Sequence, residues 1–171
     1  EKATLTLDHP GAFSYWDLDI DDVGTGYDFG NGFYPGWCGD NDNTIYPVTH
    51  TMNVKSSLVP ASWPVAPGTN GLPSAGQMNS INWLFNYLLD EGVLDPDNKA
   101  GTFDANDNNI IQDAIWAIQA DINPSGQAET WADLAAGHND FMPLPGDWAA
   151  VLFFKENDDY NHQLIFIQVD P

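Results

Sequence analysis

The chain has 171 residues and is strongly acidic, with 25 aspartates and glutamates against four lysines, no arginine and a formal net charge of −21. This balance excludes nucleic acid as a partner and argues against anionic membrane surfaces, because phosphate groups are bound by clustered lysine and arginine. With 43% hydrophobic residues, the sequence predicts one folded domain over residues 1–171 rather than a disordered polyanion. No apolar run reaches the roughly 18 residues that a membrane-spanning helix needs, so no membrane insertion is expected.

The first part of the chain has the residue patterns of β-strands. Residues 3–7 alternate, and residues 13–20 place tyrosine and aspartate on one face and tryptophan, leucine and isoleucine on the other. Residues 21–43 are rich in glycine, aspartate and asparagine and are predicted to form a loop. Residues 44–58 carry β-branched side chains that predict one or two strands, and the prolines of residues 59–73 predict an irregular connection.

Helical periodicity begins at Ser74. Ser74 and Gln77 form a capping-box pattern, and apolar residues follow at helical spacing until Gly92, where the first helix is expected to end. A second helix is predicted over about residues 108–121. A third is predicted over about residues 124–136, opened by an Asn-Pro pair and closed by a glycine.

Strand patterns return in residues 148–155 and 162–169, and the polar turn between them predicts a hairpin. The order of strands, helices and strands predicts an α+β fold, an antiparallel β-sandwich or barrel with a helical subdomain inserted between strands. The β part is expected over about residues 1–73 and 144–171, and the helical insertion over about residues 74–143.

The most informative residue is the only cysteine, Cys38, which lies in an aromatic and glycine-rich segment predicted to be a loop. One cysteine cannot form an internal disulfide, although the composition is typical of an extracellular protein. Gln112 lies 74 residues downstream, near the start of the second helix and beside its apolar stripe. A thiolate held against a glutamine carboxamide in a dry site can displace ammonia and form a thioester. The alternative is a buried thiol and a helix glutamine that binds backbone.

Two short motifs carry a family resemblance. The segment Ile-Gln-Asp-Ala-Ile-Trp at residues 111–116 resembles the motif (Thr/Ser)-Gln-x-Ala-Ile-Trp of the thioester domains of bacterial surface adhesins. The pair Trp37-Cys38 is similar to the aromatic-Cys motif of that family. The sequence departs from the family pattern at Ile111, where a hydroxyl residue is usual, and at Gly39, where an aromatic residue is common.

The resemblance implies a role for both residues. Cys38 would supply the thioester sulfur, and Gln112 would supply the acyl carbon. The chain would be a monomeric module of a larger secreted or cell-surface protein. It would attach covalently, in a single turnover rather than as an enzyme, to a lysine of a surface protein or to a polyamine.

Acidic clusters suggest calcium sites, although no cofactor is required for the thioester. Carboxylates alternate on one face of the second predicted strand, another pair follows Cys38, and a third group resembles the opening of an EF-hand loop whose twelfth position is Ile115 rather than glutamate. The alternatives are a solvated acidic surface and capping of the second helix. The candidate Ca²⁺ ligands are Asp17, Asp19, Asp40, Asp42, Asp104 and Asn106.

A second reading belongs to another class, a non-covalent, calcium-stabilised adhesin or carbohydrate-binding module of the same fold without the thioester. Seven tryptophans and six tyrosines could bind sugar rings, but most of the tryptophans fall on apolar stripes, where core packing explains them better. His50 and His138 are candidate bases, whereas His9 and His162 fit strand ends or the surface. The common motifs of hydrolases and nucleotide-binding enzymes are absent from the sequence.

Overall fold

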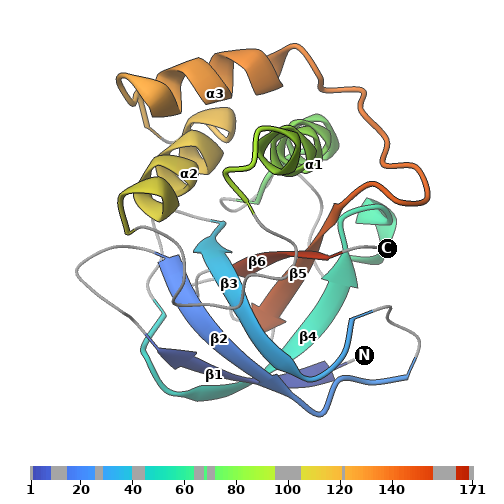
Figure 1. Cartoon of the computed structure of the whole chain (residues 1–171). Helices are drawn as coiled ribbons and strands as arrows, with labels where there is room; N and C mark the ends of the chain where they lie inside the picture. The colour runs from blue at the N-terminus through green and yellow to red at the C-terminus, as the bar shows by residue number, and fades with distance from the viewer. Residues whose placement is uncertain are drawn as a thin grey trace.

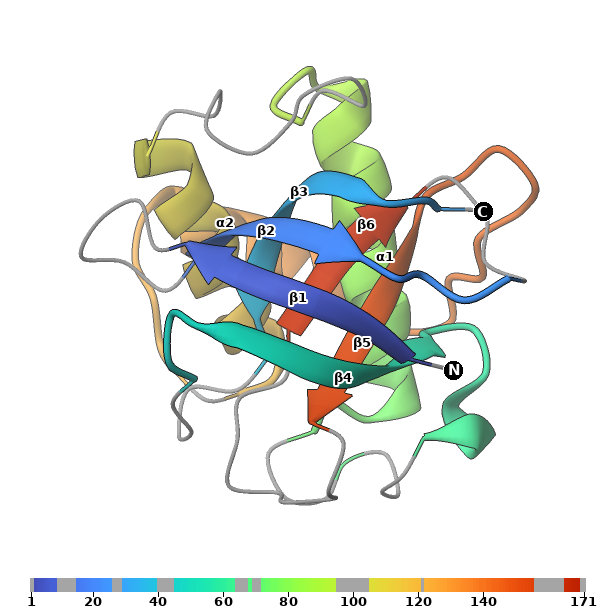
Figure 2. The same cartoon turned by 90° about the horizontal axis from the view of Figure 1, so that it is seen from below.

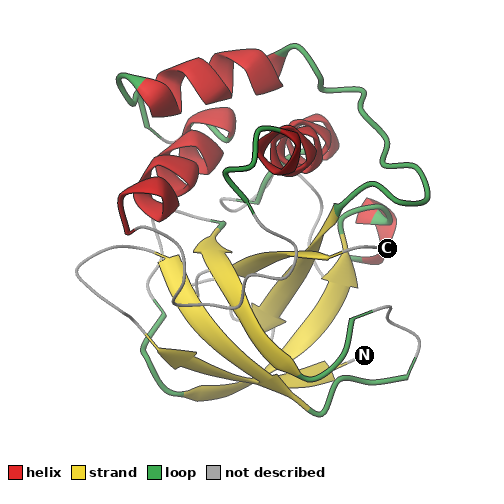
Figure 3. Cartoon of the chain, in the orientation of Figure 1, coloured by secondary structure: helices red, strands yellow, loops and turns green. Residues whose placement is uncertain are grey.

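The computed structural model describes residues 2–8, 15–25, 29–39, 45–63, 68, 72–94, 105–120, 122–155 and 165–169. In these described ranges, six strands form a closed barrel in the order β1-β2-β3-β6-β5-β4, and three helices lie over one end of it (Figures 1 and 3). All six neighbouring pairs are antiparallel (Figure 2). The predicted α+β fold is therefore confirmed, in its barrel form. The strands are β1 (Lys2–Asp8), β2 (Tyr15–Asp21), β3 (Gly32–Cys38), β4 (Thr49–Ser56), β5 (Ala149–Lys155) and β6 (Ile165–Val169).

The helices are α1 (Ala75–Asp90), α2 (Ala105–Ile118) and α3 (Gln127–Ala136), and a short 3₁₀ turn spans Pro60–Ser62. They are inserted between β4 and β5, as the order of patterns in the sequence predicts. In the part of the chain that the structure describes, no helix is both long and apolar enough to cross a membrane.

The prediction of a loop over residues 21–43 was wrong for residues 32–38, which form strand β3. Gly32, Pro35 and Gly36 hid this strand, because glycine and proline are poor strand formers. Pro35 is tolerated because β3 pairs with β2 along most of its length, whereas its described pairing with β6 involves only its last two residues. Cys38 therefore lies at the end of a strand rather than in a loop.

Several boundaries also differ from prediction. Of residues 44–58, only Thr49–Ser56 form a strand. The second helix runs from Ala105 to Ile118, three residues earlier than predicted at each end. The third begins at Gln127, after Gly126 with a positive φ of 70°, so Pro124 stays outside it.

The capping box of α1 is confirmed and has a tertiary role. The Ser74 hydroxyl accepts the Gln77 backbone N–H at 3.2 Å, and the Gln77 carboxamide oxygen accepts the Ser74 N–H at 2.7 Å. The same carboxamide donates through Nε2 to the Ile118 carbonyl at 3.1 Å. One side chain thus closes the start of α1 and attaches it to the end of α2, where carbonyl groups lack helical partners.

Two hydrophobic clusters are found among the described residues. The barrel cluster lies inside the strands and includes Leu18, Met52 and Phe153. The interlayer cluster lies between the barrel and the helices and includes Phe85 and Ile115. Because successive strand residues point to opposite faces, the end of β3 contributes to both: Trp37 belongs to the interlayer cluster and Cys38 to the barrel cluster.

Asn82 provides a buried polar contact between α1 and the barrel. It is 0% exposed, and its Oδ1 accepts the Ala150 backbone N–H of β5 at 2.8 Å and the Ser57 hydroxyl at 3.1 Å. The backbone of Ser57 in turn donates to the Ala150 carbonyl at 3.0 Å. Asn82 therefore determines how α1 sits against the ends of β4 and β5.

Replacing Asn82 tests this contact. Asn82→Ala leaves the Ala150 N–H and the Ser57 hydroxyl without their acceptor in a buried site, so it should lower the free energy of unfolding by about 2–4 kcal/mol. The matched control is Asn79→Ala on the same helix, whose half-buried side chain donates to the Asn139 carbonyl at 3.0 Å in a solvent-exposed hydrogen bond, and it should cost less than about 1 kcal/mol. Urea unfolding measures both variants, and equal losses would contradict the assigned role.

Candidate functional site

The structure brings Cys38 and Gln112 into direct contact where the end of β3 meets α2 (Figure 1). The Cys38 backbone N–H donates to Gln112 Oε1 at 2.7 Å, and Gln112 Nε2 donates to the Cys38 carbonyl at 2.7 Å. Both residues are buried, at 0% and 1% exposure. The carboxamide therefore pairs with the cysteine backbone much as a neighbouring strand would.

The sequence of α2 explains why a glutamine points at the strand. Ile111, Ala114 and Ile115 form the apolar stripe that packs in the interlayer cluster. Gln112 borders this stripe, so burying the stripe also brings its carboxamide to the barrel end. A buried carboxamide needs partners for its donor and its acceptor, and the backbone of Cys38 supplies both.

The sulfur of Cys38 lies inside the barrel cluster and accepts a hydrogen bond from a tryptophan. Trp16 on β2 donates through its indole Nε1 to Cys38 Sγ at 3.0 Å, and Trp16 is itself only 4% exposed. Sequence analysis did not identify Trp16, because the contact depends on the pairing of β2 with a strand that was predicted as a loop.

A second glutamine, Gln119, comes directly after α2 and binds the residue that follows β3. Its Nε2 donates to the carbonyl of Gly39, the residue after Cys38, and its buried Oε1 has no partner among the described residues. Gln119 follows Gln112 by two helical turns and so shares its face. This spacing is visible in the sequence, but the contact of Gln119 with Gly39 could be recognised only from the structure.

The candidate bases lie on other elements. Nε2 of His50, on β4, lies 3.0 Å from the carbonyl oxygen of Tyr46. His138 follows α3, and its ring stacks on Trp83 of α1 with centroids 4.0 Å apart and an interplanar angle of 4°. His9 and His162 lie outside the described residues. The described contacts of His50 and His138 are therefore with Tyr46 and Trp83, and they do not involve Cys38 or Gln112.

The candidate calcium ligands are only partly described. Asp40, Asp42 and Asp104 lie outside the described residues, and the side chain of Asn106 is likewise not described. Among the residues that are described, no group of three or more histidine, cysteine, aspartate or glutamate side chains is close enough to hold a metal ion. The calcium site stays a prediction.

Asp17 and the neighbouring Asp19 share the outer face of β2, whose alternate residues are buried. Asp17 lies directly opposite Asp8 of β1 in the strand register. Burial, and then the negative charge of Asp8, raise the pKa of Asp17 above its ordinary value of 3.8. The ionised pair is therefore electrostatically unfavourable unless a cation lies nearby.

The aromatic residues mainly pack the core, which weakens the case for a sugar-binding face. Four of the seven tryptophans are buried. Trp83 is more accessible, but its ring stacks with both Tyr87 and His138. The buried tryptophans are Trp16, Trp37, Trp63 and Trp131.

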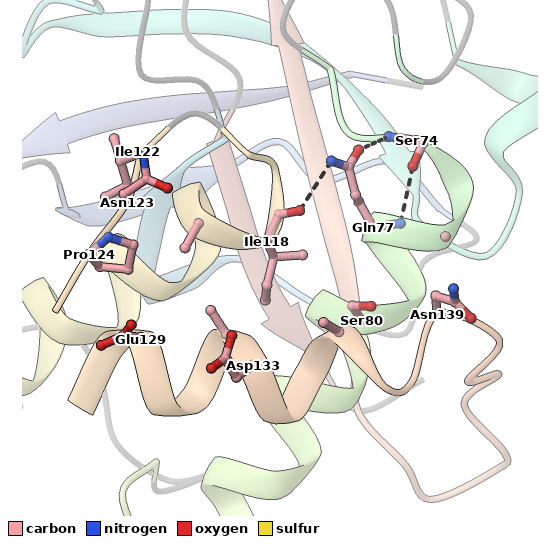
Figure 4. Close-up of a pocket in the computed structure, with 14 residues that line it drawn as sticks. Ser74, Gln77, Ser80, Ile118, Ile122, Asn123, Pro124, Glu129, Asp133 and Asn139 are labelled. Carbon is pink, nitrogen blue, oxygen red and sulfur yellow. Dashed lines mark hydrogen bonds between the residues drawn. The ribbon is translucent and has the colours of Figure 1, made fainter. Parts of the chain in front are cut away.

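A separate cavity of about 450 Å³ lies among the three helices (Figure 4). Ser74 and Gln77 line its α1 side, Ile118 its α2 side, and the carboxylates of Glu129 and Asp133 its α3 side. Neither Cys38 nor Gln112 is among its lining residues. The cavity is therefore distinct from the Cys38–Gln112 site.

The chain has the fold of the thioester domains of bacterial surface adhesins. The N-terminal thioester domain of the fibronectin-binding protein SfbI from Streptococcus pyogenes matches it with a TM-score of 0.52 and 15% identity, over 97% of this chain and 91% of that one. The N-terminal thioester domain of a surface protein from Clostridium perfringens matches with a TM-score of 0.51 and 14% identity, over 98% of each chain.

The N-terminal domain of the Streptococcus pyogenes pilus tip adhesin Cpa also matches, with a TM-score of 0.50 and 13% identity, over 99% of this chain and 94% of that one. A scan against protein-family models and a search of curated proteins both give no match. The resemblance inferred from two short motifs is thus confirmed as a likeness of fold that extends over nearly the whole chain.

The Asp17–Asp8 pair gives a prediction about pH and calcium. Because the pKa of Asp17 is raised on folding, its charge destabilises the folded state at neutral pH. Asp17→Asn should therefore raise the free energy of unfolding in chelator by up to about 1 kcal/mol, allowing for solvent screening. This gain should shrink as the pH falls through the raised pKa towards 3.8. Urea unfolding across this pH range measures it.

Asp21→Asn, which removes an exposed carboxylate from the same strand, is the matched control and should change stability little. Repeating the measurement with calcium tests the predicted site. If Asp17→Asn lowers stability only when calcium is present, Asp17 is a ligand rather than half of a repelling pair.

Proposed function

We propose that the chain is a cell-surface adhesion module in which Cys38 and Gln112 form an internal thioester that reacts with primary amines. The observation that carries the proposal is the pair of 2.7 Å hydrogen bonds that holds the Gln112 carboxamide against the Cys38 backbone in a buried site. The shared fold with thioester domains of surface adhesins supports it. The module would belong to a larger extracellular or surface-anchored chain.

Thioester formation needs no external oxidant or cofactor. Cys38 Sγ attacks the carboxamide carbon of Gln112, the C–N bond breaks, and the nitrogen leaves as ammonia with the proton of the thiol. Charge develops on Gln112 Oε1 during the attack, and the Cys38 N–H already donates to this atom. A donor aimed at a developing oxyanion lowers the barrier without reorganisation.

An amine then reacts with the thioester. Its nitrogen attacks the acyl carbon, the C–S bond breaks, and an amide forms at Gln112 while the proton lost by the amine ends on the sulfur. The product is a stable isopeptide-type bond, so the chain acts once and is not an enzyme. Suitable partners are lysines of a surface protein or polyamines, and a net charge of −21 would attract both.

Intact mass spectrometry tests the proposal. The freshly purified wild-type chain should be lighter than its sequence by one ammonia, and methylamine should convert it to a stable adduct. Cys38→Ser and Gln112→Glu should have the mass of their sequences and form no methylamine adduct, because one lacks the thiol and the other the carboxamide.

Gln127→Glu, on the exposed surface of α3, is the matched control for the glutamine change. It should keep both the mass deficit and the methylamine adduct. An unmodified wild-type mass together with a titratable thiol would contradict the covalent function and leave the non-covalent adhesin as the better reading.

A further inference from the structure

We propose that Trp16 is a catalytic residue of the thioester site, whose indole N–H stabilises the Cys38 sulfur as a thiolate when the C–S bond forms or breaks. This inference rests on the proposed function and assigns a group to the sulfur side of the reaction. It starts from the hydrogen bond of 3.0 Å from Trp16 Nε1 to Cys38 Sγ, which is buried.

The strand register explains why the indole reaches the sulfur. Trp16 lies directly opposite Gly36, and Cys38 is the next residue of β3 on the same face. Diagonal neighbours across an antiparallel pair lie within reach of an aromatic side chain. Gly36 has no side chain, so nothing at the opposite position stops the Trp16 ring from leaning towards Cys38.

The chemical character of the donor suits this position. The indole N–H is a donor only and carries no charge, so it can lie in the barrel cluster without the desolvation cost of a lysine or histidinium. A thioester sulfur is a weak acceptor, whereas a thiolate is a strong one. The contact therefore strengthens as the transition state is approached, which is the condition for catalysis rather than simple binding.

The same contact acts in both directions. When an amine attacks the acyl carbon of Gln112, the electron pair of the C–S bond moves to Sγ, and Trp16 stabilises it until the proton from the amine arrives. In thioester formation, the N–H favours the thiolate that attacks the carboxamide. The Cys38 N–H and the Trp16 N–H thus serve the two atoms that gain charge, Gln112 Oε1 and Cys38 Sγ.

The test compares Trp16→Phe with Trp63→Phe. Trp63 is also buried and its Nε1 donates to the Ser56 carbonyl at 3.0 Å, so its replacement loses a similar ring and a similar hydrogen bond elsewhere. The rate of methylamine adduct formation should fall about 10- to 100-fold in Trp16→Phe. It should stay within about twofold of wild type in Trp63→Phe.

Two further measurements separate chemistry from packing. Benzothienylalanine, placed at position 16 by site-specific incorporation, keeps the shape of tryptophan but has no N–H, and it should reproduce the slow reaction of Trp16→Phe. In the methylamine adducts, where the thiol has been released, the pH midpoint of thiolate ultraviolet absorbance should be higher in both Trp16 variants than in wild type.

The possible failures can be told apart. Wild-type reaction rates and an unchanged thiolate midpoint in the benzothienylalanine protein would overturn the role of Trp16, whatever Trp16→Phe does to folding. A wild-type chain that never loses ammonia would overturn the proposed function itself, and the intact mass reports this before any variant is compared.

Discussion

The two hydrogen bonds between the Gln112 carboxamide and the backbone of Cys38 are the constraint on which the arrangement of the two layers depends. An unpaired donor or acceptor in such a buried place would cost about 1–3 kcal/mol. The pairing therefore fixes the rotation of α2 about its axis. With Gln112 turned to the strand, Ile111 and Ile115 must face the interlayer cluster, where they pack against α1.

The end of β3 is a second constraint on the arrangement of the layers, because its last two residues pack in different hydrophobic clusters. Trp37 packs with Phe85 in the interlayer cluster, with ring centroids 5.4 Å apart, while Cys38 enters the barrel beside Trp16. A slip of one residue in the β2–β3 register would exchange these two faces and move the sulfur out of the barrel. The position of the thiol thus depends on the β2–β3 register, and burial of the large Trp37 side chain in the interlayer cluster favours that register.

Much of the architecture could be predicted from local patterns, and the exceptions have physical causes. The capping box at Ser74 and the apolar stripe of α1 depend on neighbouring residues, so they can be read directly. Closure into a barrel requires the β3–β6 pair, and β3 was hidden by its glycines and proline. The contacts of Trp16 and Gln119 with the end of β3 could not be predicted, because they follow from the register and rotation of elements distant in sequence.

The burial of the site has a consequence for the chemistry that the proposed function requires. Cys38 and Gln112 are almost completely covered, which would protect a thioester between them from water. An attacking amine must be neutral, yet only about one lysine side chain in 2,500 is neutral at pH 7. The acidic surface of the chain favours the ammonium form, whereas entry into apolar surroundings favours the neutral amine.

The amine would therefore need to be charged to be attracted and neutral to react. The surroundings that favour these two forms lie in different parts of the structure. The described carboxylates of β2 lie on the outside of the barrel, while the sulfur lies within it among apolar side chains and an uncharged indole donor. In the proposed function, an amine would be concentrated by charge at the surface and would lose its proton to water as it is desolvated. A neutral donor such as Trp16 suits that interior, since a cation beside the sulfur would repel the ammonium form on its approach.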